Sequence, residues 1–239
     1  RGWVVYWERL PSNFKAVTRF NRESPIEHTA LRAVAAIGLI SGKQLFELFG
    51  LKDKRVKMMA REHKLIRHEM QCNGQTVALY SLGPNGAIMA GVEDSYRMNY
   101  WTVYGLDDVL KCMLFFQMYR KFCEAVGEVK IVPAIKPFTG VIEIGESKQF
   151  YIYVVRGDYD DLQIFRKWNH YFNERVIVIA ESLRHLNPLI PTLSAMKVRI
   201  TLDEHLLEDF DEIQDLFYLL ENGQFVKEGH AWNVVTIGG

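Results

Sequence analysis

A short basic segment is the part of this chain whose residue types and spacing best suit a charged ligand. At helical spacing, Val56, Met59 and Ala60 fall on one apolar face, and the basic residues fall on the opposite face. In such a helix, Arg61 could bind a guanine edge, Met58 could touch a thymine methyl group, and lysines would hold phosphates. The candidate contacts are Lys52, Lys54, Arg55, Lys57, Met58 and Arg61.

A second polar set lies on a predicted β-hairpin. Residues 65–71 and 76–82 alternate between apolar and polar, and Asn73-Gly74 between them is the strongest short hairpin signal. Polar side chains on a hairpin of this kind can reach phosphates or the adjacent minor groove of DNA. The candidates are Arg67, His68, Asn73 and Gln75.

Three predicted helices precede this hairpin and would position both sets. Ser24 begins the first helix as an N-cap, and Glu27 completes a capping box. Ser41 and Gln44 form a second box that opens a short helix, and Asp53 can cap a third helix reaching about residue 63. Helix, short helix, helix and hairpin in this order are typical of a winged helix-turn-helix, whose second motif helix enters the major groove of DNA. Such units also dock on proteins, and the lysines would then be a solvated surface.

The charge distribution distinguishes the front of the chain from the rest. The net charge of the 239 residues is zero. However, residues 1–75 contain 14 Lys or Arg and 7 Asp or Glu, whereas residues 76–239 contain 15 and 22. A basic first third joined to an acidic remainder indicates an anionic partner for the front part only.

Cysteine usage and hydropathy bear on the compartment. The chain has three cysteines: Cys72, Cys112 and Cys123. Because their number is odd and no two of them form a CxxC pair, they favour reduced thiols in a cytoplasm. No stretch approaches the roughly 18 apolar residues of a membrane span. Residues 1–14 lack the small-residue cleavage site of a secretory signal. We therefore expect a cytoplasmic protein with no membrane partner.

The second part of the chain has the element order of a nuclease core. A long helix is predicted over 106–126, and shorter helices near 183–190 and 212–221. A helix is also predicted over 158–172, with Asp158 or Asp160 as its cap and with Leu162, Phe165, Trp168 and Phe172 on its buried face. Strands are predicted near 129–133, 139–144, 149–156, 175–180 and 197–202. The first six elements in chain order, α-β-β-β-α-β, form the core of restriction-endonuclease-like domains. The predicted fold is therefore α+β, with a winged helix-turn-helix over 1–95 and a nuclease-like domain over 96–239.

The catalytic groups of such a nuclease are missing. The fold needs a carboxylate on its second strand, and a carboxylate and a lysine on its third, to hold a metal that activates water. Here the second strand has Thr139 and Gly140 at the position of the acid, and the third, residues 150–155, has neither acid nor lysine. The chain also has no glycine-rich nucleotide-binding loop. We expect no enzyme activity, metal or cofactor, and a role for this domain in dimerisation or partner binding.

Other chemistry-bearing residues have structural interpretations beside functional ones. His68 and Cys72 could ligate a metal only with partners from elsewhere, and His170 is expected to be a packed or surface residue rather than a base. The acidic run 203–215 could be a metal site or a DNA mimic, but a solvated helix face is favoured. The aromatic cluster Tyr96, Tyr100, Trp101 and Tyr104 is expected in a core or a dimer interface, and base stacking is not favoured.

The chain resembles the replication-relaxation family, proteins of bacterial plasmids and integrative elements implicated in replication and DNA relaxation. The resemblance covers roughly residues 24–225 and includes GKQLFELFG at 42–50, the basic helix, and a hairpin ending in YSLGPNGAIMA at 80–90. The family often has Pro-Asp on one strand, then a Glu-x-Asp-Arg-Gly step, then a helix with Lys and Tyr. Here Pro137 precedes Phe138, and the two acids of the next step fall at Tyr153 and Val155. The matching positions are Arg156, Gly157, Lys167 and Tyr171. The resemblance implies a two-part DNA-binding protein whose nuclease-like domain has lost its acids.

Together these features predict a non-enzymatic double-stranded DNA-binding protein of a plasmid or mobile element, acting in replication, DNA relaxation or its control. We expect a homodimer that reads two half-sites, with a replication or conjugation protein as a further candidate partner. One alternative is a transcriptional regulator whose C-terminal domain senses a ligand or a partner. Another is a metal-dependent nuclease or relaxase accessory with atypical ligands drawn from Glu143, Glu146, Asp158 and Asp160.

Overall fold

The protein divides into two compact units. The computed structural model describes residues 2–17, 24–157 and 159–228. Unit 1 is Arg1–Met113 and unit 2 is Leu114–Gly239, so the division falls inside helix α5 (Leu106–Ala125). The boundary expected between residues 95 and 96 lies earlier than this division, because the following aromatic residues pack into unit 1.

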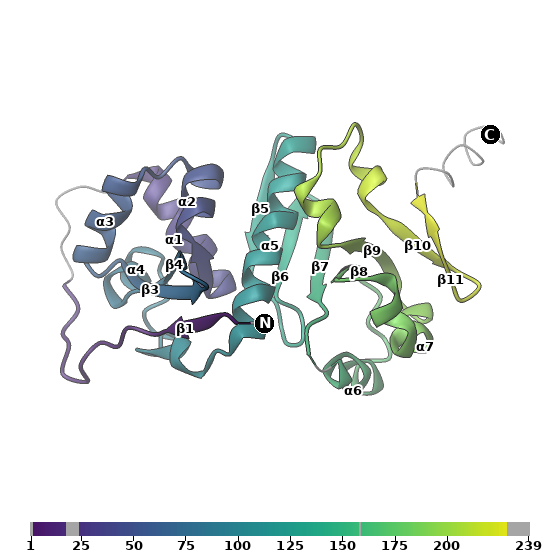
Figure 1. The fold of residues 1–239 in the computed structure, drawn as a ribbon, viewed down its shortest axis with the longest axis horizontal. Coiled ribbons are helices and arrows are strands. Elements are labelled where there is room, and N and C mark those ends of the chain that lie inside the picture. The colour runs from purple at the N-terminus through teal and green to yellow at the C-terminus, as the bar shows by residue number, and fades with distance from the viewer. Residues whose placement is uncertain (1, 18–23, 158, 229–239) are drawn as a thin grey trace. The chain divides into compact units, whose positions relative to one another are not determined.

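Unit 1 combines helices with a small antiparallel sheet (Figure 1). The sheet order is β1-β3-β4-β2, and strand β1 at the sheet edge was not predicted. The helices are α1 (Pro25–Ile37), α2 (Gly42–Phe49), α3 (Asp53–Arg61), α4 (Pro84–Met89) and the 3-10 helix η1 (Tyr100–Val103). The strands are β1 (Val4–Tyr6), β2 (Leu39–Ser41), β3 (Leu65–Cys72) and β4 (Gln75–Leu82).

The helix ends agree with the predicted caps in one case of three. The capping box of α2 is confirmed: the amide of Gln44 donates to Ser41 Oγ over 3.2 Å, and the amide of Ser41 donates to Gln44 Oε1 over 3.3 Å. The box at α1 is wrong, because Ser24 makes no side-chain cap bond and Glu27 is buried. Asp53 is not the cap of α3 either; Lys52 holds that position without a side-chain cap bond.

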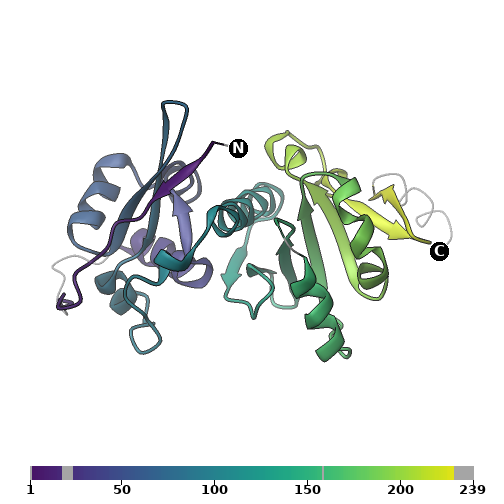
Figure 2. The ribbon, with the colours of Figure 1, turned by 60° about the horizontal axis from the view of Figure 1, so that its bottom comes forward.

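The predicted hairpin is confirmed. Strands β3 and β4 pair in antiparallel register up to Cys72 opposite Gln75, which leaves Asn73 and Gly74 as a two-residue loop. Both loop residues have positive φ, 47° and 79°, as a type I′ turn requires. In Figure 2 the hairpin extends from unit 1, with β1 alongside it.

The aromatic cluster after α4 belongs to the interior of unit 1. Trp101 is fully buried, and its Nε1 donates to the carbonyl of Glu8 over 2.7 Å. The hydroxyl of Tyr100 donates to the carbonyl of Gly38 over 2.6 Å and accepts from the amide of Leu82 over 2.9 Å. The sequence predicts a core or a dimer interface for this cluster, and these contacts place Tyr100 and Trp101 in the core.

Unit 2 is built on a mixed sheet of seven strands in the order β11-β10-β9-β8-β7-β6-β5. Strands β7, β8 and β9 are parallel, and the strands on either side of them are antiparallel. The strands are β5 (Val129–Val132), β6 (Gly140–Ile144), β7 (Lys148–Val154), β8 (Arg175–Ala180), β9 (Lys197–Leu202), β10 (Tyr218–Glu221) and β11 (Gln224–Lys227). The helices are α6 (Asp160–Trp168), α7 (Ile190–Ser194) and the 3-10 helices η2 (Leu183–Leu189), η3 (Glu204–Leu207) and η4 (Ile213–Leu216).

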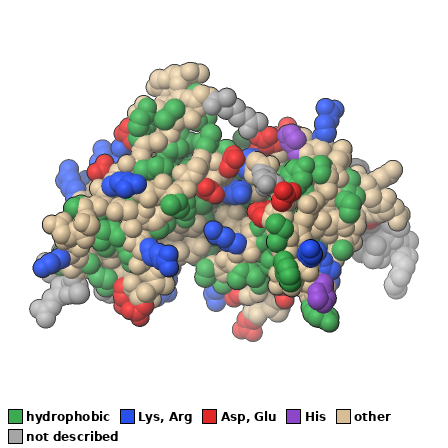
Figure 3. All heavy atoms as spheres, turned by 90° about the horizontal axis from the view of Figure 1, so that it is seen from below, with side chains coloured by type: hydrophobic (Ala, Val, Ile, Leu, Met, Phe, Trp, Pro, Cys, Tyr) green, Lys and Arg blue, Asp and Glu red, His purple; other side chains and the backbone are tan. Residues whose placement is uncertain are grey.

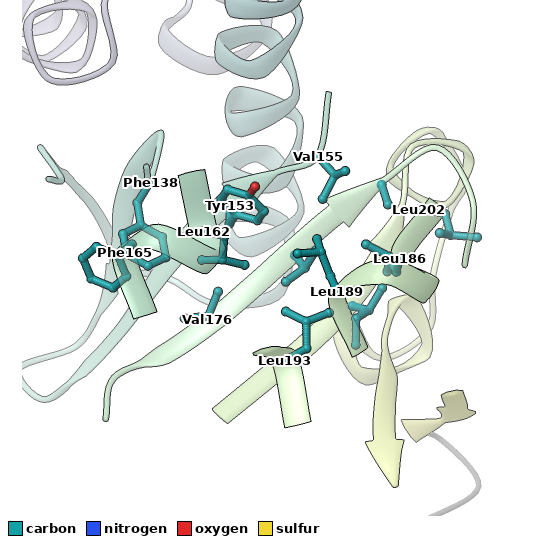
Figure 4. Packing of buried hydrophobic residues seen from close by; sticks show 13 residues of the cluster. Phe138, Tyr153, Val155, Leu162, Phe165, Val176, Leu186, Leu189, Leu193 and Leu202 are labelled. Carbon is teal, nitrogen blue, oxygen red and sulfur yellow. The ribbon is translucent and has the colours of Figure 1, made fainter. Parts of the chain in front are cut away.

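The core of unit 2 lies between the sheet and its short helices. Leu162 and Phe165 of α6 pack with Leu186 and Leu189 of η2 and with alternate residues of β8 (Figure 4). Residues 176–180 of β8 are buried without alternation, as predicted for a strand covered on both faces. No helix among the residues that the structure describes is long and apolar enough to span a bilayer.

Three expectations for unit 2 are wrong. The helix predicted near 212–221 is instead η4 followed by the hairpin β10–β11. The Asn222-Gly223 loop of this hairpin has φ values of 50° and 74°. It is therefore an Asn-Gly turn like that of the first hairpin. Trp168 was predicted on the buried face of α6, but it is 75% exposed. The predicted cap Asp160 lies inside α6, and the other candidate cap, Asp158, lies outside the described residues.

Two glycines of the YSLGPNGAIMA segment are required by close backbone packing. A Cβ at Gly83 would overlap the carbonyl of His63, and a Cβ at Gly86 would overlap the carbonyl of Lys64. We expect Gly83→Ala and Gly86→Ala each to lower the free energy of unfolding by about 1–3 kcal/mol or more, measured in urea. The control is Gly127→Ala, where a Cβ meets nothing within 4 Å. An effect of Gly83→Ala no larger than the control's would contradict the packing.

Candidate nucleic-acid interface

Helix α3 presents a basic face to solvent. Val56 and Met59 are buried, whereas the predicted contacts Lys52, Lys54, Lys57, Met58 and Arg61 are exposed. Four of these residues, Lys54, Lys57, Met58 and Arg61, line one shallow depression with Asp53 and Glu62. The helical period therefore separates the two faces as the sequence predicts.

The cations of this face differ in how far they are neutralised. Lys57 Nζ lies 2.9 Å from Asp53 Oδ2 in an exposed pair. Lys52, Lys54 and Arg61 form no ion pair with any residue that the structure describes. Their charge is therefore available to an anionic ligand, and exposed pairs such as Lys57–Asp53 are weak enough to exchange partners.

Arg55 is half-buried, and its guanidinium pairs with α1 instead of joining the exposed cations of this face. Its Nη2 donates to Glu27 Oε2 over 2.7 Å, and this bond raises the pKa of Arg55. Glu27 itself is fully buried on α1. The prediction that Arg55 contacts a ligand is therefore corrected: it is a positioning residue that connects α3 to α1.

A second cation lies near Glu27, although Glu27 Oε1 accepts no hydrogen bond from the residues that the structure describes. Lys64 Nζ lies 3.8 Å from Glu27 Oε1 and is also paired with Glu62. Lys64 is 1% exposed, so this is a buried network of charges from α1, α3 and the turn before β3. A buried carboxylate that lost these cations would carry an uncompensated desolvation penalty.

The segment after β4 holds the C-terminal end of α3. The side-chain amide of Asn85 donates to the carbonyl of Glu62 over 2.8 Å, and its backbone amide donates to that of His63 over 3.1 Å. The amide of Gly83 donates to the carbonyl of Lys64 over 3.0 Å. The GPNG segment is therefore a structural clamp on the basic helix.

The base of the hairpin adjoins α3. Arg67 is exposed and donates to Glu69 over 2.7 Å, and it lies opposite Tyr80 in the β3–β4 register. Burial raises the pKa of Tyr80, and the charges of Arg67 and of Lys57 on α3 act against this rise. At the tip, Asn73 and Gln75 are exposed as predicted. Arg67 can thus extend the exposed surface of α3, and Asn73 and Gln75 are exposed at the far end of the hairpin.

His68 is a correction to the predicted site. It is 1% exposed, and its Nδ1 accepts a hydrogen bond from the amide of Glu8 over 3.0 Å. The proton of the neutral ring is therefore on Nε2, which lies 2.7 Å from Ser81 Oγ. Burial lowers the pKa of His68 to about 3. His68 supports the sheet and the segment around Glu8 rather than meeting a ligand.

The positions at which the resemblance expects two acids hold other side chains. Tyr153 and Val155 are buried, and the hydroxyl of Tyr153 donates to Asp161 Oδ1 over 2.7 Å. Next to them, the buried Arg156 is paired with Asp203 of the acidic run. That run forms η3, η4 and connecting segments rather than the favoured solvated helix face.

The atypical metal ligands that lie within the described residues are not gathered into a metal site. Glu143 accepts a hydrogen bond from Gln149 over 2.8 Å, and Asp158 lies outside the described residues. Among residues 2–17, 24–157 and 159–228, no group of three His, Cys, Asp or Glu side chains could hold a metal ion. Glu146 is exposed in the turn before β7, and Asp160 is exposed as the first residue of α6.

Comparisons with known proteins were made for the whole chain. No family model, no curated protein and no solved structure matches it. The exposed basic face of α3 and the adjoining hairpin are therefore interpreted from their own residues.

The buried network predicts a large effect of neutralising Glu27. In Glu27→Gln, Lys64 keeps a buried charge without its full complement of partners, so we expect unfolding free energy to fall by about 3–5 kcal/mol. The measurement is equilibrium urea unfolding followed by tryptophan fluorescence. Glu69→Gln removes an exposed pair in the same unit and should leave the unfolding free energy close to that of the wild type. Equal losses in the two variants would show that the Glu27 network is not a stabilising constraint.

The burial of His68 predicts a pH effect. Because its folded-state pKa of about 3 lies below the unfolded value near 6.5, only the unfolded chain binds a proton between these values. Stability at neutral pH is therefore lost as pH falls below about 6.5, by up to about 1.4 kcal/mol per unit. In NMR spectra of the folded protein the ring resonances of His68 should stay unchanged from pH 7 to 5. A titration midpoint near 6.5 would mean that the ring is open to water.

Proposed function

We propose that unit 1 is a winged helix-turn-helix that binds double-stranded DNA, and that the protein is a non-enzymatic DNA-binding protein. The observation that carries the proposal is the basic face of α3, where Lys52, Lys54 and Arg61 have no anionic partner among the described residues. The order α1, β2, α2, α3 and hairpin supports this assignment, because it matches the motif's element order.

In the proposed complex, the nine-residue helix α3 enters the major groove. An α-helix with its side chains is about 10–12 Å across, and the groove is about 12 Å wide. Arg61 would bind a guanine edge, Met58 would contact a thymine methyl group, and the lysines would bind phosphates. Asn73 and Gln75 at the tip of the hairpin would contact the adjacent backbone or minor groove.

Unit 2 supports the non-enzymatic part of the proposal. The meander β5–β6–β7, helix α6 and parallel strand β8 follow the element order of a restriction-endonuclease-like core. Where such a core would carry acids, this chain has Tyr153 and Val155, and Phe138 is packed 5.1 Å from the ring of Phe165. These substitutions favour a scaffold over a nuclease with atypical ligands.

The proposal also covers the kind of genetic element on which the protein acts. The resemblance to the replication-relaxation family suggests a plasmid or mobile element, and a role in replication, DNA relaxation or its control. Two copies would read two half-sites spaced by helical turns, since one helix of nine residues contacts few base pairs. Transcriptional regulation would use the same surface of α3.

The test is binding to labelled duplex DNA. From a random duplex library, the wild-type protein selects a sequence, and its affinity is then measured by fluorescence anisotropy at several salt concentrations. We expect Arg61→Ala to weaken binding to the selected duplex about 5- to 150-fold, more than binding to random duplex. Lys54→Ala should weaken both and reduce the salt slope by about one.

Two results bound the interpretation of this experiment. Lys130→Ala, in an exposed pair with Glu128 on unit 2, is the matched control and should leave duplex affinity unchanged. Equal losses on selected and random duplex in Arg61→Ala would make Arg61 a phosphate contact. If the protein does not bind duplex DNA even at low salt, the proposed function is wrong.

A further inference from the structure

Helix α6 and the loop after it present aromatic side chains to solvent. Trp168 is 75% exposed and Tyr171 is 88% exposed. The opposite face of α6 is already buried, because Leu162 and Phe165 pack in the core of unit 2 (Figure 4). Trp168 and Tyr171 are therefore additional apolar surface that the fold does not use.

The backbone of this loop is held in place by one arginine. Arg166 Nη1 donates to the carbonyls of Asn169, His170 and Phe172 over 3.2, 2.8 and 3.3 Å, and Nη2 donates to that of Ala195 over 3.2 Å. Phe172 anchors the loop from below, stacked 5.3 Å from Phe138. The exposure of Tyr171 is thus built on a fixed backbone.

Three exposed cations belong to α6 and to the strands that follow it. Lys167 Nζ lies 5.9 Å from the ring of Trp168, and Arg175 and Lys197 are register partners on β8 and β9. All three are exposed, and none forms an ion pair with a residue that the structure describes. Between residues 166 and 175 the sequence has one acid, Glu174, although the chain beyond residue 75 is acidic overall.

Hydrophobic, basic and histidine side chains meet on this end of unit 2 (Figure 3). The rings of His170 and Tyr171 lie 4.2 Å apart, so the histidine extends the aromatic surface. Flat faces bordered by cations suit a ligand that is both aromatic and anionic. Single-stranded nucleic acid has this chemistry, because its bases stack on aromatic side chains while its phosphates bind cations. A duplex does not offer its base faces.

We propose that this surface, the α6 platform, binds single-stranded DNA. The α6 platform consists of Lys167, Trp168, His170, Tyr171, Arg175 and Lys197. The inference rests on the proposed function in one respect, since the DNA-binding unit 1 makes DNA the strand that the platform meets. An apolar protein groove would match the aromatic residues but would leave the three cations without counter-charges.

The experiment measures affinity for a fluorescein-labelled oligo-dT of about 12 nucleotides, a length within the range of single-strand binding sites. In Trp168→Ala/Tyr171→Ala we expect the dissociation constant to rise about tenfold or more, because both stacking surfaces are lost. Trp168→Phe/Tyr171→Phe keeps the aromatic planes and should stay within about threefold of wild type. Leu207→Ala removes an equally exposed apolar side chain of unit 2 and should have no effect.

The outcomes separate this inference from the proposed function. If the alanine variant loses oligo-dT but keeps the selected duplex, and Arg61→Ala does the reverse, both surfaces are established. If wild type binds oligo-dT through the platform but binds no duplex, the function proposed for unit 1 fails and the α6 platform stands. Unchanged oligo-dT affinity in the alanine variant overturns the inference, and a concurrent change from dimer to monomer in sedimentation assigns the surface to a second copy of the chain.

Discussion

The carboxylate of Glu27 lies inside unit 1 without access to water, and its counter-charges come from two other segments. Arg55 reaches it from α3, and Lys64 reaches it from the turn before β3. A charge buried in this way tolerates little displacement of its partners, because each lost contact leaves an uncompensated charge in a poorly polarisable interior. The network therefore fixes the rotation of α3 about its axis, and this rotation determines which cations remain outside.

The same unit keeps its sheet and its helices in register through neutral polar contacts. His68, held uncharged by burial, accepts from the amide of Glu8, and the indole of Trp101 donates to the carbonyl of that residue. These bonds attach the segment after β1 to the interior, although nearly a hundred residues separate Glu8 from Trp101. The GPNG segment acts similarly at the end of α3, where the absence of Cβ atoms on Gly83 and Gly86 lets two backbones touch. These contacts together hold the basic helix α3 in place at its inner face and at its C-terminal end.

The interior of the mixed sheet of unit 2 is apolar. Phe138, Tyr153 and Val155 belong to one buried cluster. The nearest ionised pair, Arg156 with Asp203, neutralises itself. At the end of α6, Lys167 forms no ion pair with a described residue, and the guanidinium of Arg166 supports the carbonyls of the following loop. The proposed binding chemistry of this unit is thus at its surface, in rings and cations rather than in carboxylates.

Local signals in the sequence were sufficient for much of the fold. Apolar periodicity, the Ser41–Gln44 box and the Asn73-Gly74 turn act over a few residues, so α2, the first hairpin and the buried strand β8 could be predicted from them. The exposed face of α3 followed from the same periodicity. Tertiary structure decided the rest: Glu27 and Arg55 look like a cap and a ligand contact along the chain, yet they pair with each other 28 residues apart. His68 is buried because its ring contacts Ser81 and the amide of Glu8. Trp168 is exposed because Phe165 and Phe172 already occupy the core beside it. Spacing along one element encodes its faces, but whether a polar or aromatic side chain is buried depends on partners that only the folded chain brings together.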